Sequence, residues 1–242
     1  MIKFFRKIRQ NLLMENKTGR YFKYAIGEIV LVMIGILLAL QVSNWNNNRQ
    51  NKTLEKLTLV SLKNDLILQA KIIKTQIYEE EAYVDKVDSC LMMIKSKIEI
   101  GIMVTLFDSL SERLTFVSNR VAFDNIGSNG KTTIITNPDL NKEIVKYYQH
   151  LEYTESVINN NNLYRVNSQF GAYVLNNDLG IQINSEGQPF LADDIGAAKK
   201  FRLVKHLEGR RYSAENNREK CIIQLDNTIS LIDLINKELN ND

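Results

Sequence analysis

One apolar stretch near the amino terminus, from Tyr21 to Trp45, constrains this chain more than any other feature of its sequence. As an α-helix it is about 37 Å long at about 1.5 Å per residue, enough to cross a hydrocarbon core of about 30 Å with some tilt. Tyr21 and Tyr24 lie at one end and Trp45, the only tryptophan, at the other, as in the aromatic belts of membrane proteins. We therefore predict a transmembrane helix over residues 21–45, in contact with a lipid bilayer, rather than the buried core helix of a soluble protein.

A cleaved signal peptide is the main alternative, because a basic region precedes a short uninterrupted apolar core from Ile29 to Leu40. That basic region is long for a signal peptide, and LALQVSNWN at the end of the apolar stretch contains no small-x-small cleavage site. We predict an uncleaved membrane anchor.

The distribution of charge predicts the orientation of this anchor. Residues 1–27 contain seven Lys and Arg residues against one Glu, a charge of +6, which leaves −3 for the remainder because the whole chain carries +3. Positive residues beside a span stay on the cytoplasmic side, so we predict a cytoplasmic amino terminus. The basic excess is thus a topology signal and gives no support for nucleic-acid binding, which needs a basic face on the folded domain.

The basic segment itself, residues 1–20, has two interpretations. Phe5, Ile8 and Leu12 share one face of a helix, and basic residues occupy most of the remainder. This pattern suits a short amphipathic helix on an anionic inner leaflet. The alternative is a positively charged flank without a defined helix.

Glu28 is the one residue that breaks the apolar rule within the span. At about 100° per residue, Gly35 and Ala39 lie within about 20° of Glu28 on the helical wheel, and Val32 lies within about 40°. A face with a carboxyl group and a small-xxx-small pair is typical of packing between membrane helices. We predict that this face joins copies of the chain or binds a partner membrane protein. Proton or ion movement through Glu28 is the alternative, but one carboxylate near one end, without a partner charge in the span, makes a poor conduction path.

Beyond the span, apolar residues recur mostly at intervals of three, four or seven from Leu54 onward, which predicts one amphipathic helix, or two helices broken near Glu79. Its stripe is Leu59, Leu62, Leu66, Ile73, Ile77, Val84, Val87, Leu91, Ile94 and Ile98. Because polar residues such as Gln69 and Gln76 interrupt the stripe, we predict a helical bundle rather than a strict parallel coiled coil.

Three further elements follow. We predict a short helix over residues 104–117, and a longer one that Asn137 caps and that has Pro138 in its first turn. Residues 175–192 alternate around Glu186 and predict a small hairpin or an ordered loop. The last helix covers about residues 194–239. Its expected apolar stripe is Phe201, Val204, Ile222, Leu225, Ile229, Ile232 and Leu239. The fold class is therefore all-α, with a single transmembrane helix followed by an elongated antiparallel helical bundle.

Catalytic signatures are absent from the sequence. His150 and His206 are the only histidines, and neither has metal-ligand neighbours at a recognised spacing. GSNGKTT lacks the first glycine of a phosphate-binding loop, because Asn125 occupies that position. We therefore expect no enzyme activity, no metal, no cofactor and no bound nucleotide.

The two cysteines, Cys90 and Cys221, lie in separate predicted helices. They form either a disulfide that closes a long loop, or two buried free thiols. Their spacing does not decide between these alternatives.

The chain resembles a known family over its first fifty residues. MIKFFRKIRQ and YAIGEIVLVMIGILLALQVSNWN closely resemble the opening of an uncharacterised single-pass membrane family common in Bacteroidota, a domain of unknown function, and SNGKTTIITNPDLNKEIVKYYQHLE resembles it more loosely. The resemblance implies a bacterial inner-membrane protein with a periplasmic helical region, here residues 46–242. It implies no activity. We expect a membrane-anchored scaffold or accessory subunit of a cell-envelope complex; an envelope sensor, or an ion-coupled oligomeric subunit that uses Glu28, are the alternatives.

Overall fold

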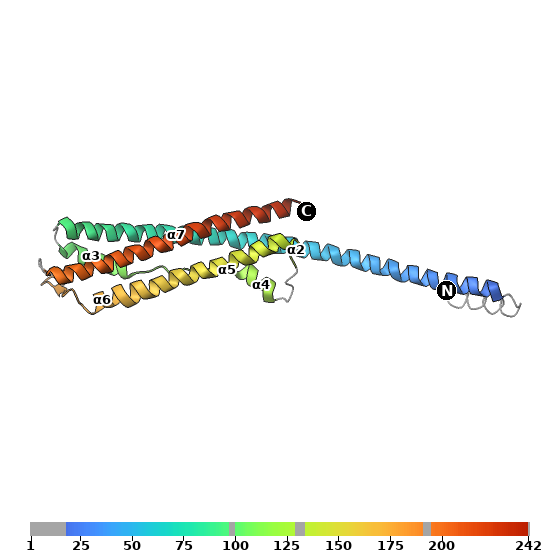
Figure 1. The fold of residues 1–242 in the computed structure, drawn as a ribbon, viewed down its shortest axis with the longest axis horizontal. Coiled ribbons are helices and arrows are strands. Elements are labelled where there is room, and N and C mark those ends of the chain that lie inside the picture. The colour runs from blue at the N-terminus through green and yellow to red at the C-terminus, as the bar shows by residue number, and fades with distance from the viewer. Residues whose placement is uncertain (1–17, 97–99, 129–133, 191–194, 242) are drawn as a thin grey trace. The chain divides into compact units, whose positions relative to one another are not determined.

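The computed structural model describes residues 18–96, 100–128, 134–190 and 195–241, which Figure 1 colours from blue to red. They divide into two units, residues 1–55 and residues 56–242. The predicted amphipathic segment over the first thirteen residues lies outside the described part of the chain, as do residues 129–133 of the GSNGKTT stretch.

The first unit contains the start of α2, a helix that runs from Thr18 to Ser96. Its residues from Ile29 to Gln50 are all exposed, although most of those up to Leu40 are apolar. This helix is long and apolar enough to cross a membrane, as the sequence predicts. The long helix expected after Leu54 is also confirmed, as one element without a break near Glu79.

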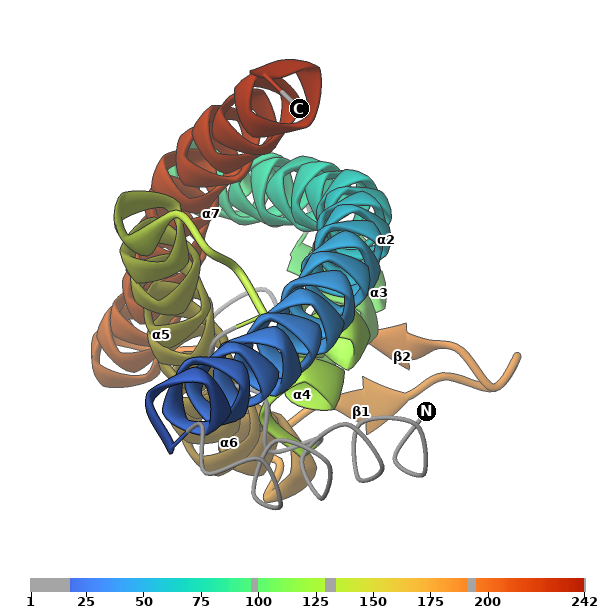
Figure 2. The ribbon, with the colours of Figure 1, turned by 90° about the vertical axis from the view of Figure 1, so that its right-hand side faces the viewer.

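The second unit is a bundle of long helices. Its other elements are α3 (Ile100–Ser111), α4 (Val121–Ser128), α5 (Pro138–Asn161), the π-helix η1 (Asn162–Gly171), α6 (Ala172–Leu175) and α7 (Ala197–Asn241). Figures 1 and 2 show α5 and α7 side by side. They run antiparallel, because Asn137 contacts Glu238 at one end and Asn161 contacts Asn217 further along. The prediction of an all-α bundle is confirmed.

Two local predictions agree with the structure. The side chain of Asn137 caps α5 by accepting hydrogen bonds from the backbone N–H groups of Asp139 (3.1 Å) and Leu140 (3.2 Å). The expected hairpin consists of the antiparallel strands β1 (Gln182–Ile183) and β2 (Pro189–Phe190).

The second predicted helix is too long at its carboxyl end, because α3 ends at Ser111 rather than at residue 117. Residues 112–120 have no regular secondary structure, and side chains from other elements bind their backbone. Asn159 accepts a hydrogen bond from the Phe116 N–H (3.1 Å) and donates one to the Phe116 carbonyl (2.9 Å). Asn162 donates to the Leu114 carbonyl. These long-range bonds replace the helical ones that the local sequence favours.

The helix α4 lies between residue 117 and Asn137, where the sequence pattern predicts no helix. Its start is capped from a distance: the Asp65 carboxylate on α2 accepts a hydrogen bond from the Ala122 N–H at 2.7 Å. Since this acceptor lies 57 residues away in the chain, no local capping signal exists.

The predicted apolar face of the last helix is correct only in part, because Val204, Leu225, Ile232 and Leu239 are half-buried against the two hydrophobic clusters. Phe201, Ile222 and Ile229 are 63%, 38% and 46% exposed, whereas Leu203 and Leu207 are buried. In addition, α7 begins at Ala197, and residues 191–194, which include the predicted start, lie outside the described residues.

Candidate functional site

Buried positions on α2 and α7 alternate at intervals of three and four residues over long stretches, regardless of polarity. On α2 they are Glu55, Leu59, Leu62, Leu66, Gln69, Ile73, Gln76, Glu80, Tyr83, Val87, Cys90 and Ile94. On α7 they are Leu203, Leu207, Arg210, Ala214, Asn217, Cys221, Gln224, Thr228, Leu231 and Ile235, and Ser213 is buried in addition, next to Ala214. A mean spacing of about 3.5 residues is that of helices packed with a left-handed twist. Gln69 and Gln76, which the sequence pattern treats as interruptions of the stripe, are therefore core positions.

Six of the eleven buried polar or charged residues in the described part of the chain lie at one level of the bundle, and the others, such as Gln69 and Gln224, lie elsewhere. We define the polar layer as Gln76, Glu80 and Tyr83 on α2, Arg210, Ser213 and Asn217 on α7, and Asn162 on η1. All seven are buried. One hydrophobic cluster lies on the side of Leu59 and Ile235, and a second lies on the side of Val87 and Leu203. The polar layer thus divides the core of the bundle into two parts.

Glu80 carries the negative charge of the layer, with 1% of its surface exposed. Its Oε1 atom accepts hydrogen bonds from Gln76 (2.8 Å) and from Asn217 (3.0 Å). Its Oε2 atom is buried and has no hydrogen-bond partner among the described residues. Asn217 also approaches the side-chain oxygen of Asn162 at 3.4 Å, which connects all three helices of the layer.

Arg210 carries the positive charge, and it is also 1% exposed. Its Nε atom donates to the Leu110 carbonyl (3.2 Å) and one terminal nitrogen donates to the Glu112 carbonyl (3.4 Å), both just beyond or at the end of α3. The guanidinium group lies 4.2 Å from the centre of the Tyr83 ring, a favourable cation–π distance. Arg210 therefore joins α7 to α2 and to the segment after α3.

Burial dominates the electrostatics of the layer. It raises the pKa of Glu80 above its ordinary value, although Asn217, Gln76 and the charge of Arg210 act in the opposite direction. Burial likewise lowers the pKa of Arg210, which the charge of Glu80 opposes. An arginine stays charged in proteins, so Glu80 is the group in the layer whose charge is able to change.

The π-helix η1 begins at this layer with Asn162. Its buried residues, Asn162, Val166 and Phe170, are spaced by four and therefore share one face of the helix. At its end, a Cβ atom on Gly171 would lie only 3.1 Å from the Val166 carbonyl oxygen, so a glycine fits this tight turn. Extended π-helices are rare and frequently mark functional positions.

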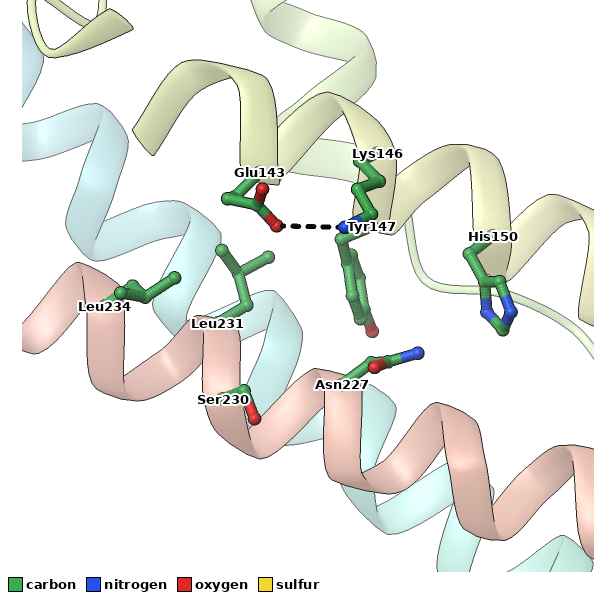
Figure 3. Close-up of a pocket in the computed structure, with 8 residues that line it drawn as sticks. All are labelled: Glu143, Lys146, Tyr147, His150, Asn227, Ser230, Leu231 and Leu234. Atoms are coloured by element: carbon green, nitrogen blue, oxygen red, sulfur yellow. Dashed lines mark ion pairs between the residues drawn. The ribbon is translucent and has the colours of Figure 1, made fainter. Parts of the chain in front are cut away.

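A separate groove of about 140 Å³ lies between α5 and α7 (Figure 3). Its lining is Glu143, Lys146, Tyr147, His150, Asn227, Ser230, Leu231 and Leu234. Its titratable side chains bind neighbours: Lys146 pairs with Glu143 at 3.6 Å, the Tyr147 hydroxyl contacts Thr228 at 2.9 Å, and His150 Nδ1 donates to Gln224. The groove has room for a small apolar group, but it presents no nucleophile beside a base.

The predicted packing face of the membrane segment lies on α2. Val32 is 53% exposed, space is open around the Cα atom of Gly35, and Glu28 is partly exposed. Ala39 is exposed as well. These residues share one helical face, as the sequence predicts, and packing of this face against a partner stays a prediction.

Of the predicted interface anchors, Trp45 is 65% exposed. Tyr21 and Tyr24 belong to α2, and their side chains lie outside the described part.

The cysteines are free, buried thiols in the structure. The contacts of Asp88 with Arg211 and of Glu81 with Arg218 fix the register of α2 against α7. In this register Cys221 lies opposite about residue 78, which is about 18 Å along the helix from Cys90 at 1.5 Å per residue. A disulfide needs Cα atoms within about 7 Å, so the structure has the free-thiol alternative and not the disulfide.

Within the described residues, no three His, Cys, Asp or Glu side chains gather as metal ligands.

The fold and this site define a class: a helical-bundle protein with one helix able to cross a membrane and a buried polar layer in its core. The chain belongs to the family of unknown function DUF6090, whose model matches residues 28–192. This match includes most of the apolar stretch, α3 to α6 and the hairpin. No curated protein and no solved structure matches the chain.

Sequence reasoning missed the polar layer, because hydrophobic periodicity scores a buried Glu, Arg or Asn as a solvent-facing residue. The only feature of the sequence that could have identified these buried polar residues is their spacing from the apolar core positions. Intervals of three and four continue through Gln69, Gln76 and Glu80 without a shift, so a pattern traced by position rather than by polarity identifies them.

Proposed function

We propose that this protein is a membrane-anchored helical scaffold or accessory subunit of a cell-envelope complex, and that it acts by binding rather than by catalysis. The observation that carries the proposal is the composition of α2. This single helix contains an exposed apolar stretch up to Trp45, and from Leu59 onward it contributes buried residues to the bundle. This composition supports the proposal that α2 is both the membrane anchor and part of the folded binding domain.

The charge pattern supports an orientation for this anchor. Residues 1–20 would be cytoplasmic, residues 21–45 would span the bacterial inner membrane, and residues 46–242 would be periplasmic. The partners we propose are the bilayer and either a second copy or an envelope membrane protein. Nucleic acid, nucleotide and cofactors have no part in the proposal.

Fusions to the carboxyl terminus test the topology. Alkaline phosphatase fused after Asp242 should be active, and green fluorescent protein fused there through the same export route should be dark, because the bundle lies outside the cytoplasm. The protein should also resist extraction of membranes with alkaline carbonate. An active cytoplasmic reporter, or release by carbonate, would contradict the proposal.

Crosslinking in native membranes, followed by affinity purification and mass spectrometry, tests the binding role. The variant Gly35→Leu/Ala39→Leu should lose crosslinked species, because two large side chains prevent close approach of helices. The control is Val30→Leu/Met33→Leu, which changes the opposite face of the same helix and should crosslink as the wild type does. Equal crosslinking of both variants would exclude the Glu28 face as the interface.

An envelope sensor is the second candidate, and the polar layer favours it. A core divided into two hydrophobic clusters allows one part to respond separately from the other. A sensor should change its crosslinking pattern when envelope conditions change, whereas a scaffold should retain the same partners.

An ion-coupled subunit is the third alternative. It requires Glu28, so unaltered proton flux in a Glu28→Gln variant would remove it.

A further inference from the structure

The polar layer contains two opposite charges that do not contact each other directly. Glu80 and Arg210 are both 1% exposed. Although the structure describes both side chains, it shows no hydrogen bond or ion pair between them. Each instead binds neutral groups: Glu80 binds two side-chain amides, and Arg210 binds two backbone carbonyls and the face of Tyr83. The negative charge is therefore only partly compensated.

Three buried polar atoms at this level lack a partner within the described part of the chain: Glu80 Oε2, one terminal nitrogen of Arg210, and Ser213 Oγ. Leaving a buried polar atom without a hydrogen bond costs about 1–3 kcal/mol, and more for a charged group. Both hydrogen bonds to Glu80 reach the same oxygen, Oε1. This arrangement suits a neutral carboxylic acid better than a carboxylate, because a carboxylate spreads its charge over two oxygens.

We propose that the polar layer is a proton-dependent joint in the helical domain, which tightens when Glu80 takes up a proton and loosens when Glu80 is ionised. The proton comes from solvent and adds to the carboxylate to give the neutral acid. The net charge of the Glu80 and Arg210 pair changes from zero to +1 in this step. The inference concerns the bundle itself and does not depend on the proposed function.

The groups around Glu80 set the direction of this response. On α2, Glu79 adds a repelling negative charge and Tyr83 is an uncharged phenol whose own pKa burial raises. On α7, Arg210 attracts the carboxylate, Asn217 is neutral, and burial raises the pKa of the Cys221 thiol to about 12. The neutral side chain of Asn162 approaches from η1, and Glu112, beyond α3, acts on Tyr83.

The sum of these effects raises the pKa of Glu80 in the folded state. A raised pKa means that the folded protein binds this proton at a higher pH than the unfolded chain does. The stabilisation is complete below the ordinary value of 4.5 and is lost as the pH rises through the pKa of the folded state. Acidification from neutral pH should therefore strengthen the layer.

The position of the layer gives this titration a structural consequence. The layer separates the two hydrophobic clusters, and η1 begins within it. Apolar burial between residues 77 and 87 of α2 is low, since the core positions there are Glu80 and Tyr83. Local opening is easiest where few apolar contacts resist it, so a change in the charge of Glu80 acts at a level where polar side chains replace most of the apolar packing.

Hydrogen exchange measured by mass spectrometry on the full chain in lipid nanodiscs tests the proposal. Rates between about pH 5 and pH 8 are corrected for intrinsic exchange and followed in peptides from residues 76–90 of α2 and from η1. In the wild type we expect corrected exchange in these peptides to slow by about threefold or more at the lower pH. In Glu80→Gln, which keeps an acceptor at the same place without the charge, exchange should be slow at both values.

The control is Glu81→Gln, which changes the next residue and removes only the exposed pair with Arg218. It should retain the pH dependence of the wild type. The proposal is overturned if corrected exchange in the wild type does not depend on pH, or if Glu80→Gln keeps the wild-type dependence. Should Glu80→Gln lose its helical circular dichroism at pH 8, the neutral form does not stabilise the layer and the proposal also fails.

Discussion

A substitution of Asn159 tests which contacts stabilise the segment after α3, residues 112–120. The side chain of Asn159 makes two hydrogen bonds to the backbone of Phe116, at 3.1 Å and 2.9 Å, and Phe116 is 1% exposed. Each bond is worth about 1 kcal/mol net, and the buried N–H and carbonyl left without partners add a further desolvation cost. We expect Asn159→Ala to lower the free energy of unfolding by about 2–4 kcal/mol.

The neighbouring residue provides a matched control. Asn160 is exposed, and its side chain donates a hydrogen bond to Ser156 on the same helix, so Asn160→Ala should cost less than about 0.5 kcal/mol. Urea titration of the full chain in detergent micelles, followed by far-ultraviolet circular dichroism, measures both. A loss in Asn159→Ala that equals the loss in Asn160→Ala would refute the reasoning, because the backbone of Phe116 would then find water or other partners at no cost.

Three other perturbations test separate parts of the structure. Arg210→Met should destabilise the bundle by about 3 kcal/mol at pH 8 and by less at pH 5. Removal of the positive charge raises the pKa of Glu80 further, so at pH 5 a proton neutralises the carboxylate that has lost its countercharge. Urea titrations at both pH values measure the difference, and an equal loss of stability at both would contradict the prediction. Asp65→Ala removes the cap of α4 and should cost about 1 kcal/mol, with faster hydrogen exchange confined to that helix; uniform exchange changes across the bundle would exclude a local cap. Burial raises the pKa of Cys90 to about 11 and that of Cys221 to about 12. At pH 8 iodoacetamide should therefore label neither thiol in the folded protein, and it should label both after unfolding without reductant. Rapid labelling of the folded protein would contradict this, because it would show that the thiols are accessible.

The start of α5 shows what short-range chemistry settles. Asn137 has a side chain that binds the first free N–H groups of the helix, and Pro138 has the backbone angle that a first turn needs. Both effects act between neighbouring residues, so the sequence predicted this boundary correctly. The apolar stretch up to Trp45 is equally local, because its length and composition alone make it able to cross a membrane.

The candidate site depends on longer-range contacts. Glu80 and Arg210 look like surface residues of amphipathic helices, and only the packing of α2, α7 and η1 reveals that they are buried together. Charged residues are rarely buried unless they are paired or hydrogen-bonded, and most of their partners here come from residues more than 90 positions away in the chain. No pattern in a window of adjacent residues contains that information.

By itself, the sequence determined the apolar helix, the helical class of the remainder and the capped start of α5, because periodicity, length and capping act over a few turns. Tertiary structure alone decided where α3 ends, that α4 forms, which face of α7 is buried and that the cysteines are apart. In the first three cases a side chain from a distant segment satisfies a backbone group, or a neighbouring helix excludes water from a polar residue. The separation of the cysteines follows from the register of α2 against α7. Such contacts depend on the relative positions of whole elements, which local propensities do not specify.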